Sequence, residues 1–333
     1  MCYPNVASNL FFKTRIKQML CRRFLRTIAA IVLLATMTAQ ATRAEDESYL
    51  LVYKFETNQF VHYQVAHKTT IDIVFGQSKQ TTVNESKTRK HFRVITADAD
   101  TALLEPVIDH VRMTAQADDG DPIVFDSSAP AKKCPLAFLN ILKTVGKPMS
   151  RVKFTTSGKL LAVIPFNAKP KPIGQPNSQQ QKPANDPSRN FLVEFSKERI
   201  RVGERWSDDI NVDVNLTPKL KKQIVLRRTY LLQSVEGQLA TIRLKTAVLS
   251  PLNDPAIEAQ LIQRTPAGTI VFDIDQGQIV SRKTKIDKVV INPFGPKSSM
   301  RAVSIRTERR LNPAEIASKP AAGKAGADVP RKR

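Results

Sequence analysis

The sequence predicts a mainly β protein, a β-rich α+β fold of antiparallel sheets or an open half-barrel, with two related halves and one or two short helices. Apolar and polar residues alternate with a period of two along most of the chain, as in residues 210–216. Turn signals such as Gln276-Gly277 separate these stretches. Strands with one apolar and one polar face are typical of an antiparallel sheet with one side against solvent.

Residues 1–44 have the order of a secretory signal peptide. Arginines at positions 22, 23 and 26 precede an uncharged run of 16 residues, 27–42, which ends in small residues just before the acidic residues 45–47. The run is shorter than the roughly 20 residues that a membrane-spanning helix needs. The sequence therefore predicts export to the periplasm or cell envelope, with cleavage near Ala41 or Ala44. Met19 is an alternative start, and a retained membrane anchor is the alternative to cleavage.

The following strands are expected at alternating apolar positions. In chain order these are Val61/Tyr63/Val65, Ile71/Ile73/Phe75, Ile210/Val212/Val214/Leu216, Ile270/Phe272/Ile274 and Val303/Ile305. Two helices are expected between them. One covers residues 134–145 and places Leu136, Leu139, Leu142 and Val145 on one face, and the other begins at Asp254-Pro255 and ends near Ile262.

The sequence divides the chain into two β-rich halves, residues 45–166 and 189–312, joined by a Pro- and Gln-rich linker at 167–188. Residues 313–333, rich in Ala, Pro, Gly and Lys, are predicted to be a disordered tail. Both halves contain Ile-Val-Phe-Asp, at 123–126 and 270–273, which indicates distant copies of one plan; chance similarity between β-rich segments is the alternative. We expect Phe125 and Phe272 to face the core and Asp126 and Asp273 to face the other way.

The charge of the chain is strongly positive and uneven. There are 52 Lys and Arg against 30 Asp and Glu, a net charge of +22, with an excess of +1 over residues 45–165 and +9 over 189–312. The basic second half indicates an anionic partner: an envelope polymer, a membrane surface or lipid, or an acidic protein. A solvated basic surface is the alternative. The cations are not interleaved with aromatic residues, so we expect no nucleic-acid partner.

No catalytic, cofactor-binding or metal-binding residues are predicted. The chain lacks a zinc-protease helix, a nucleophile elbow, a phosphate-binding glycine loop and a zinc-spaced Cys/His cluster. His62 and His67, five residues apart, are expected on opposite faces of one strand, and together with His91 and His110 they are interpreted as structural or surface histidines.

Other chemically active residues also favour structural roles. Cys134 is the one cysteine after residue 44, so no intramolecular disulfide is expected there, and we interpret it as half-buried and inert rather than as a nucleophile. Trp206 is interpreted as a core residue rather than a stacking platform. The carboxylates of Asp98/Asp100, Asp118/Asp119/Asp121 and Asp273/Asp275 are interpreted as turn residues rather than as acid–base pairs or calcium ligands.

Several segments together resemble a group of exported bacterial proteins of unknown function. These are the signal peptide, residues 51–55, residues 202–206, and the hairpin Gly-Thr-Ile-Val-Phe-Asp followed by Gly-Gln-Ile-Val-Ser at 268–281. The layout is more loosely similar to the LolA-type lipoprotein-carrier fold, an unclosed antiparallel β-barrel with helices against its concave face. That resemblance implies a carrier of acyl chains and no catalytic residues.

The sequence therefore predicts an exported, non-enzymatic binding or scaffold protein of the bacterial cell envelope, which contacts anionic partners through its basic C-terminal half. The alternative is a periplasmic carrier with an apolar groove for lipid or acyl ligands, covered by Leu136, Leu139 and Leu142. A hydrolase is the third reading, and nothing in the sequence supplies its nucleophile and base.

Overall fold

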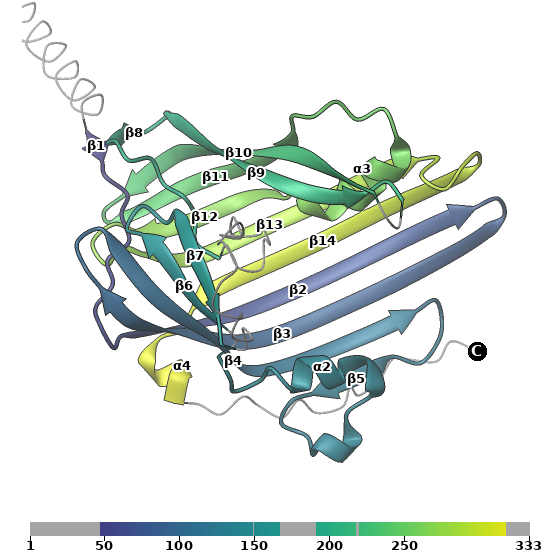
Figure 1. Ribbon diagram of the computed structural model, residues 1–333, viewed down its shortest axis with the longest axis horizontal. Helices are drawn as coiled ribbons and strands as arrows, with labels where there is room; N and C mark the ends of the chain where they lie inside the picture. The colour runs from purple at the N-terminus through teal and green to yellow at the C-terminus, as the bar shows by residue number, and fades with distance from the viewer. Residues whose placement is uncertain (1–46, 149, 167–190, 218–219, 318–333) are drawn as a thin grey trace, which may run out of the picture. The chain divides into compact units, whose positions relative to one another are not determined.

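A computed structural model describes residues 47–148, 150–166, 191–217 and 220–317 (Figure 1). The predicted signal peptide, the predicted linker and residues 318–333 of the predicted tail lie outside this part of the chain. The chain divides into a short unit, Met1–Ser48, and a main unit, Tyr49–Arg333, and the description below concerns the main unit. No helix of the described residues is long and apolar enough to cross a membrane.

One open antiparallel sheet of twelve strands forms the main unit, which confirms the predicted fold class. Its strands, in chain order, are β2 (Phe60–Phe75), β3 (Ser78–Ala97), β4 (Thr101–Ala117), β5 (Ile123–Asp126), β6 (Ser150–Thr155), β7 (Leu160–Pro165), β9 (Arg205–Asn215), β10 (Lys221–Glu236), β11 (Leu239–Val248), β12 (Ala267–Asp273), β13 (Gln278–Ile291) and β14 (Ser298–Arg310). Two further strands, β1 (Ser48–Tyr49) and β8 (Ile200–Arg201), have two residues each. The order in the sheet is β7-β6-β4-β3-β2-β14-β13-β12-β11-β10-β9, with β5 paired to β4.

The two halves of the sequence meet at the centre of this sheet. The last long strand, β14, pairs along its length with the first, β2, from Arg310 opposite Tyr63 to Ser298 opposite Phe75. Most consecutive strands within each half are antiparallel neighbours joined by short turns, the arrangement that the alternating pattern and the Gly-containing turns predict. The exceptions are the longer connection between β11 and β12, and β6, which pairs with β4 and not with β5. The halves are therefore parts of one continuous sheet.

The main hydrophobic core lies on one face of the sheet, here called the inner face. It combines residues of both halves, including Phe92 and Phe154 of the first and Tyr230, Ile242 and Phe272 of the second. The segments that carry Tyr53 and Phe195 cross this face, and the Tyr53 ring stacks on Phe195 at 5.1 Å between centroids. Trp206 packs against the same core, stacked on Tyr230 at 5.3 Å, as predicted.

The two Ile-Val-Phe-Asp strands are buried at their Phe positions but occupy different places. Phe272 is fully buried in the main core, whereas Phe125 is buried in a separate cluster with Phe138 and Val111. The strand β12 lies between β11 and β13, while β5 is a short edge strand paired only with β4. Asp273, expected to face away from the core, is buried at the start of a turn, where it accepts the Gln276 N–H at 2.8 Å.

The helix expected after Asp254 is present as α3 (Pro255–Leu261), continued by the 3-10 turn η3 (Ile262–Arg264). The Asp254 side chain caps it by accepting the Ala256 N–H at 2.8 Å. Figure 1 shows α3 between the β9–β10 edge and β13–β14, and it contacts both β9 and β13. These strands are four positions apart, about 19 Å in a flat sheet, so the sheet must curve inward for a single helix to reach both.

The other expected helix, residues 134–145, is wrong in length and face. The structure has three short pieces here: η1 (Ala131–Lys133), η2 (Leu136–Phe138) and α2 (Leu139–Leu142). No side chain caps either η2 or α2, and Phe138 leaves helical geometry to reach Phe125, at 5.4 Å between ring centroids. Leu136, assigned to the buried face, is 86% exposed.

A further helix lies within the predicted disordered tail. Residues Pro313–Ala317 form α4. Asn312 and Glu315 cap it reciprocally: Asn312 Oδ1 accepts the Glu315 N–H at 2.9 Å, and Glu315 Oε2 accepts the Asn312 N–H at 3.1 Å. The prediction of disorder used the overall composition of residues 313–333 and did not consider this capping box.

The predicted apolar face of β14 is also wrong, because the alternation at Val303/Ile305 placed these two residues on the buried face. Its buried residues are Ser298, Ala302, Ser304 and Glu308, and Ile305 is exposed on the opposite, outer face. The pairing with β2 decides this register, because it places Ser304 opposite Thr69 and Ile305 opposite Lys68. The middle of the inner face is therefore polar, although it lies on the same face of the sheet as the main apolar core.

Candidate ligand-binding site

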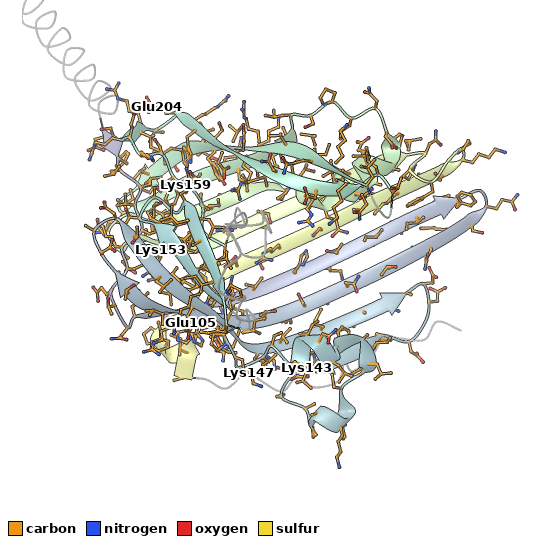
Figure 2. The ribbon with its side chains drawn as sticks, in the orientation of Figure 1. Glu105, Lys143, Lys147, Lys153, Lys159 and Glu204 are labelled. Atoms are coloured by element: carbon orange, nitrogen blue, oxygen red, sulfur yellow. The ribbon has the colours of Figure 1, made fainter. Side chains whose placement is uncertain are left out.

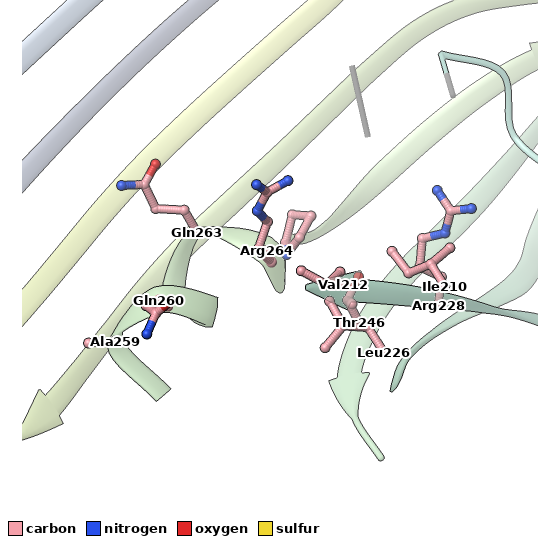
Figure 3. Close-up of a pocket in the computed structure, with 10 residues that line it drawn as sticks. Ile210, Val212, Leu226, Arg228, Thr246, Ala259, Gln260, Gln263 and Arg264 are labelled. Carbon is pink, nitrogen blue, oxygen red and sulfur yellow. The ribbon is translucent and has the colours of Figure 1, made fainter. Parts of the chain in front are cut away.

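A cavity of about 490 Å³ lies between α3–η3 and the inner faces of β9, β10 and β11 (Figure 3). We call it the α3 cavity. Its apolar lining residues are Ile210, Val212, Leu226, Ala259 and Pro266, and its polar lining residues are Arg228, Thr246, Gln260, Gln263 and Arg264. Its volume and mixed lining are typical of small-molecule sites, which usually span about 300–1,000 Å³.

The position of α3 creates this cavity. Ile257 and Leu261 pack on Val212 and Leu226 of the strand edge, whereas Ala259 and Ile262 pack with Val290 and Ala302 near the sheet centre. Gln260 fastens the helix to the end of β9, because its amide donates to Asn215 O and accepts the Asn215 N–H, both at 2.9 Å. The helix thus spans the curved face, and the space beneath η3 stays open.

Thr246 supplies an unpaired polar atom to the cavity. Its side chain is 7% exposed, and its Oγ1 has no hydrogen-bond partner in the described part of the chain. A buried hydroxyl left without a partner costs about 1–3 kcal/mol. A ligand oxygen or a water molecule in the cavity would remove that penalty once a rotation of the Thr246 side chain turns the buried Oγ1 toward it.

The two arginines of the cavity differ in their pairing. Arg228 forms a bidentate ion pair with Asp208, with Nε 3.0 Å from Asp208 Oδ1. Arg264, at the end of η3, forms no ion pair or hydrogen bond with the described residues and is exposed at the cavity. Arg264 is therefore the cation that can receive an anionic group from a ligand (Figure 3).

The residues singled out in the sequence lie elsewhere. Cys134 is half-buried before η2, with Sγ 3.5 Å from Pro135 O, in keeping with an inert role. Asp98 and Asp118 act as turn residues: Asp98 accepts the Thr101 N–H at 2.6 Å and Asp118 the Thr81 N–H at 2.6 Å. The groove expected under Leu136, Leu139 and Leu142 is not where the cavity lies. The cavity was missed because no sequence pattern reports that α3 bridges two distant strands.

His67 and Ser304 form the arrangement nearest to a catalytic pair. On the polar part of the inner face, His67 Nε2 lies 2.8 Å from Ser304 Oγ, and Thr69 Oγ1 lies 3.1 Å from both. None of the described carboxylates bonds to His67, and burial together with Arg306 lowers its pKa. A buried serine shared with a threonine, beside a histidine that no acid orients, favours a structural network.

Two charged residues on the same face, Lys90 and Glu308, form an ion pair. Lys90 Nζ lies 2.8 Å from Glu308 Oε1, and Arg306 also contacts this carboxylate, at 3.7 Å. Burial raises the pKa of Glu308, but the Lys90 and arginine charges outweigh it and lower the value to about 2. At the other end of the sheet, Glu105 (labelled in Figure 2) accepts from Arg151 Nε at 3.2 Å, which ties β4 to β6.

His62 and His91, by contrast, are brought together on the outer face with Asp109. The His91 Nδ1 atom lies 2.6 Å from Asp109 Oδ1, and His62 Nδ1 lies 3.9 Å from Asp109 Oδ2. The comparison of His62 with His67 concerned one strand only, so it could not detect a partner from the next strand.

Comparison with known proteins finds solved structures of low identity and low TM-score. No protein-family model and no curated protein matches the chain. Among solved structures, a lipovitellin studied for its lipid–protein interactions has 10% identity and a TM-score of 0.43 over 82% of this chain, which spans only 27% of the lipovitellin chain. DynF from the dynemicin biosynthesis pathway of Micromonospora chersina has 6% identity and a TM-score of 0.21, covering 81% of this chain and 89% of DynF. A DUF1329 family protein from Desulfovibrio piger has 9% identity and a TM-score of 0.13, covering 75% and 84%.

Proposed function

We propose that this is an exported, non-enzymatic binding protein whose α3 cavity holds an amphipathic ligand with an apolar chain and one anionic group. The observation that carries the proposal is the division of the cavity lining. Ile210, Val212 and Leu226 offer apolar surface, while Arg264 has no partner among the described residues and the Thr246 hydroxyl is buried and unpaired.

Each part of the lining selects a feature of the ligand. Apolar walls favour a hydrocarbon chain because its burial releases about 25 cal/mol per Å². A guanidinium recognises a carboxylate or phosphate through two parallel hydrogen bonds. The buried hydroxyl favours a ligand oxygen over a methyl group, because only the oxygen completes its hydrogen bond. A fatty acid or a similar single-chain anion combines these features.

The test is a displacement assay on the full chain. Dansylaminoundecanoic acid serves as the fluorescent probe, and dodecanoate and dodecanol compete with it. We expect saturable binding and a preference for dodecanoate over dodecanol. The Arg264→Gln change should remove this preference while dodecanol binding is unchanged. Arg243→Gln is the control, because Arg243 lies next to the buried Ile242 and faces the outer side.

A variant whose larger side chain occupies the α3 cavity gives a second, independent test of the binding site. Ala259→Phe should reduce binding of both competitors, because Ala259 lines the cavity. Equal affinity for the acid and the alcohol in the unmodified protein would refute anion recognition. Undiminished binding by a folded Ala259→Phe variant would refute the cavity as the site.

The outer face supports a second candidate function, contact with an anionic envelope polymer or surface. Strands β11 and β13 flank β12 there and carry Arg243, Lys245, Lys283 and Lys285 across from the uncharged Thr269 and Ala267. Lys285 pairs with Asp287, while the other three have no ion pair among the described residues. The protein should bind a phosphate-rich resin and elute with salt, and Lys245→Gln with Lys283→Gln should lower the eluting salt concentration.

A further inference from the structure

Three metal-ligating side chains meet on the outer face of β2, β3 and β4. His62 and His91 are direct partners in the β2–β3 register, and their ring centroids are 5.1 Å apart. Their neighbours Val61 and Phe92 are buried in the core, so the two imidazoles face the opposite side. Asp109 joins them from β4.

Asp109 reaches the histidines because of an irregularity in the sheet. In the β3–β4 register Lys90 pairs with Ile108 and Arg89 pairs with His110, so Asp109 is an extra residue without a partner on β3. Such bulges redirect a side chain relative to the regular alternation. Here the bulge turns the carboxylate toward the His62–His91 pair.

We propose that His62, His91 and Asp109 form a binding site for a divalent transition-metal ion, with Zn²⁺ as the ion of choice. One ligand atom from each residue lies within 4.8 Å of the others. A tetrahedral zinc site with bonds of about 2.0–2.2 Å separates its ligand atoms by about 3.3 Å. The three residues stand on neighbouring strands of one sheet, so we expect side-chain rotations without backbone movement to bring the atoms to these distances.

The donor set fits this chemistry. Two imidazoles and one carboxylate suit zinc and other first-row ions, and three protein ligands leave at least one coordination position open. The side chains are 21%, 17% and 35% exposed for His62, His91 and Asp109, so solvent reaches that position.

The surroundings shape one side of the site. The Phe60 ring lies 5.5 Å from the His91 ring and 6.4 Å from the His62 ring, between centroids. The Arg93 guanidinium lies over the Phe60 ring, 5.9 Å from its centroid. Arg89 and Arg93 are nearby cations that oppose metal charge, and Arg89 donates to Glu315 O at 2.6 Å. This site is independent of the α3 cavity and of the function proposed for it.

The test is a zinc competition titration of the full chain against a chromophoric chelator, with the thermal midpoint as a second readout. We expect a zinc equivalent whose dissociation constant rises more than tenfold in His91→Gln and in Asp109→Asn. Zinc should raise the thermal midpoint of the unmodified protein and not of these variants. Co²⁺ loaded at this site should show ligand-field bands without a thiolate charge-transfer band, which separates it from binding at cysteine.

The matched control is His110→Gln, because His110 also pairs with a carboxylate, Asp126, at 2.9 Å, but lacks a second histidine. This variant should bind zinc as the unmodified protein does. Equal weakening by His110→Gln and His91→Gln, or a zinc equivalent that persists in a folded His62→Gln/His91→Gln variant, would overturn the assignment.

Discussion

The hydroxyl of Tyr53 accepts the backbone N–H of Val193 at 2.9 Å, across 140 residues of sequence. Tyr53 belongs to the segment that precedes the first long strand, and Val193 to the segment that precedes β9. Both residues are buried in the main core. Burial raises the pKa of the Tyr53 hydroxyl well above its ordinary range, so the group stays protonated and keeps this bond. This contact joins the beginnings of the two halves within one core.

Replacement of Tyr53 by Phe should lower the free energy of unfolding by about 1–3 kcal/mol, because the Val193 N–H loses its acceptor inside the core. Tyr63→Phe is the comparison: its hydroxyl donates to Ile279 O at 3.2 Å, and an under-satisfied carbonyl is tolerated better than an orphaned N–H. Denaturant melts of both variants measure the difference. A larger loss for Tyr63→Phe would contradict this ranking.

Two turn glycines with the same backbone angle should respond differently to Ala. Gly237 and Gly277 both have φ of +60°, which costs about 1–2 kcal/mol for an L residue. A Cβ on Gly237 meets no atom within 4 Å, but one on Gly277 would lie 2.3 Å from Lys54 N. Gly277→Ala should therefore destabilise the protein several kcal/mol more than Gly237→Ala in thermal or denaturant melts. Equal losses would show that the Lys54 segment moves aside freely.

The ion pair of Lys90 with Glu308 predicts acid sensitivity. The pKa of Glu308 is lowered to about 2 in the folded protein from 4.5. Its stabilising contribution is therefore complete above about pH 4.5 and is lost as the pH falls toward 2, by on the order of 2–3 kcal/mol. Unfolding free energies measured between pH 6 and pH 2 test this prediction.

The control for the acid effect is a variant without the pair. Glu308→Gln alone leaves Lys90 buried and unpaired, so Lys90→Met/Glu308→Gln is the better comparison. Its unfolding free energy should fall less between pH 5 and pH 2 than that of the unmodified protein. Parallel curves for the two proteins would assign the acid sensitivity to other carboxylates.

The unpaired hydroxyl of Thr246 makes a prediction about stability without ligand. Thr246→Val removes a buried polar atom that has no partner among the described residues, so the ligand-free protein should gain about 1 kcal/mol of unfolding free energy. The same change should weaken dodecanoate binding. Thr269→Val is the control, because Thr269 faces the outer side, opposite Arg243. A destabilised Thr246→Val protein would mean that the hydroxyl already has a partner.

The periodicity of the chain was sufficient to predict the fold class and much of the strand content. Alternation at Val61/Tyr63/Val65 and at Ile210/Val212/Val214 identified real strands and, in both, the face that packs inward. The Asp254-Pro255 pair identified α3, because a capping carboxylate and an N-terminal proline act within one turn of helix. The predictions for residues 134–145 and for the start of the tail were wrong. The helix at 134–145 is broken because Phe138 packs against Phe125 of β5, and α4 depends on a cap formed by two residues, Asn312 and Glu315.

The sequence by itself determined those features that depend on near neighbours: strand periodicity, turn positions, the cap of α3 and the basic excess of the second half. Tertiary structure alone decided the pairing of β2 with β14, the register that makes the middle of the inner face polar, and the reach of α3 from β9 to β13. It also decided the meeting of His62, His91 and Asp109, which are separated by 29 and 18 residues and joined by strand register and one bulge. The physical reason is that a ligand site requires side chains within a few ångströms, and in an antiparallel sheet that proximity is set by pairing between strands, which no local pattern encodes.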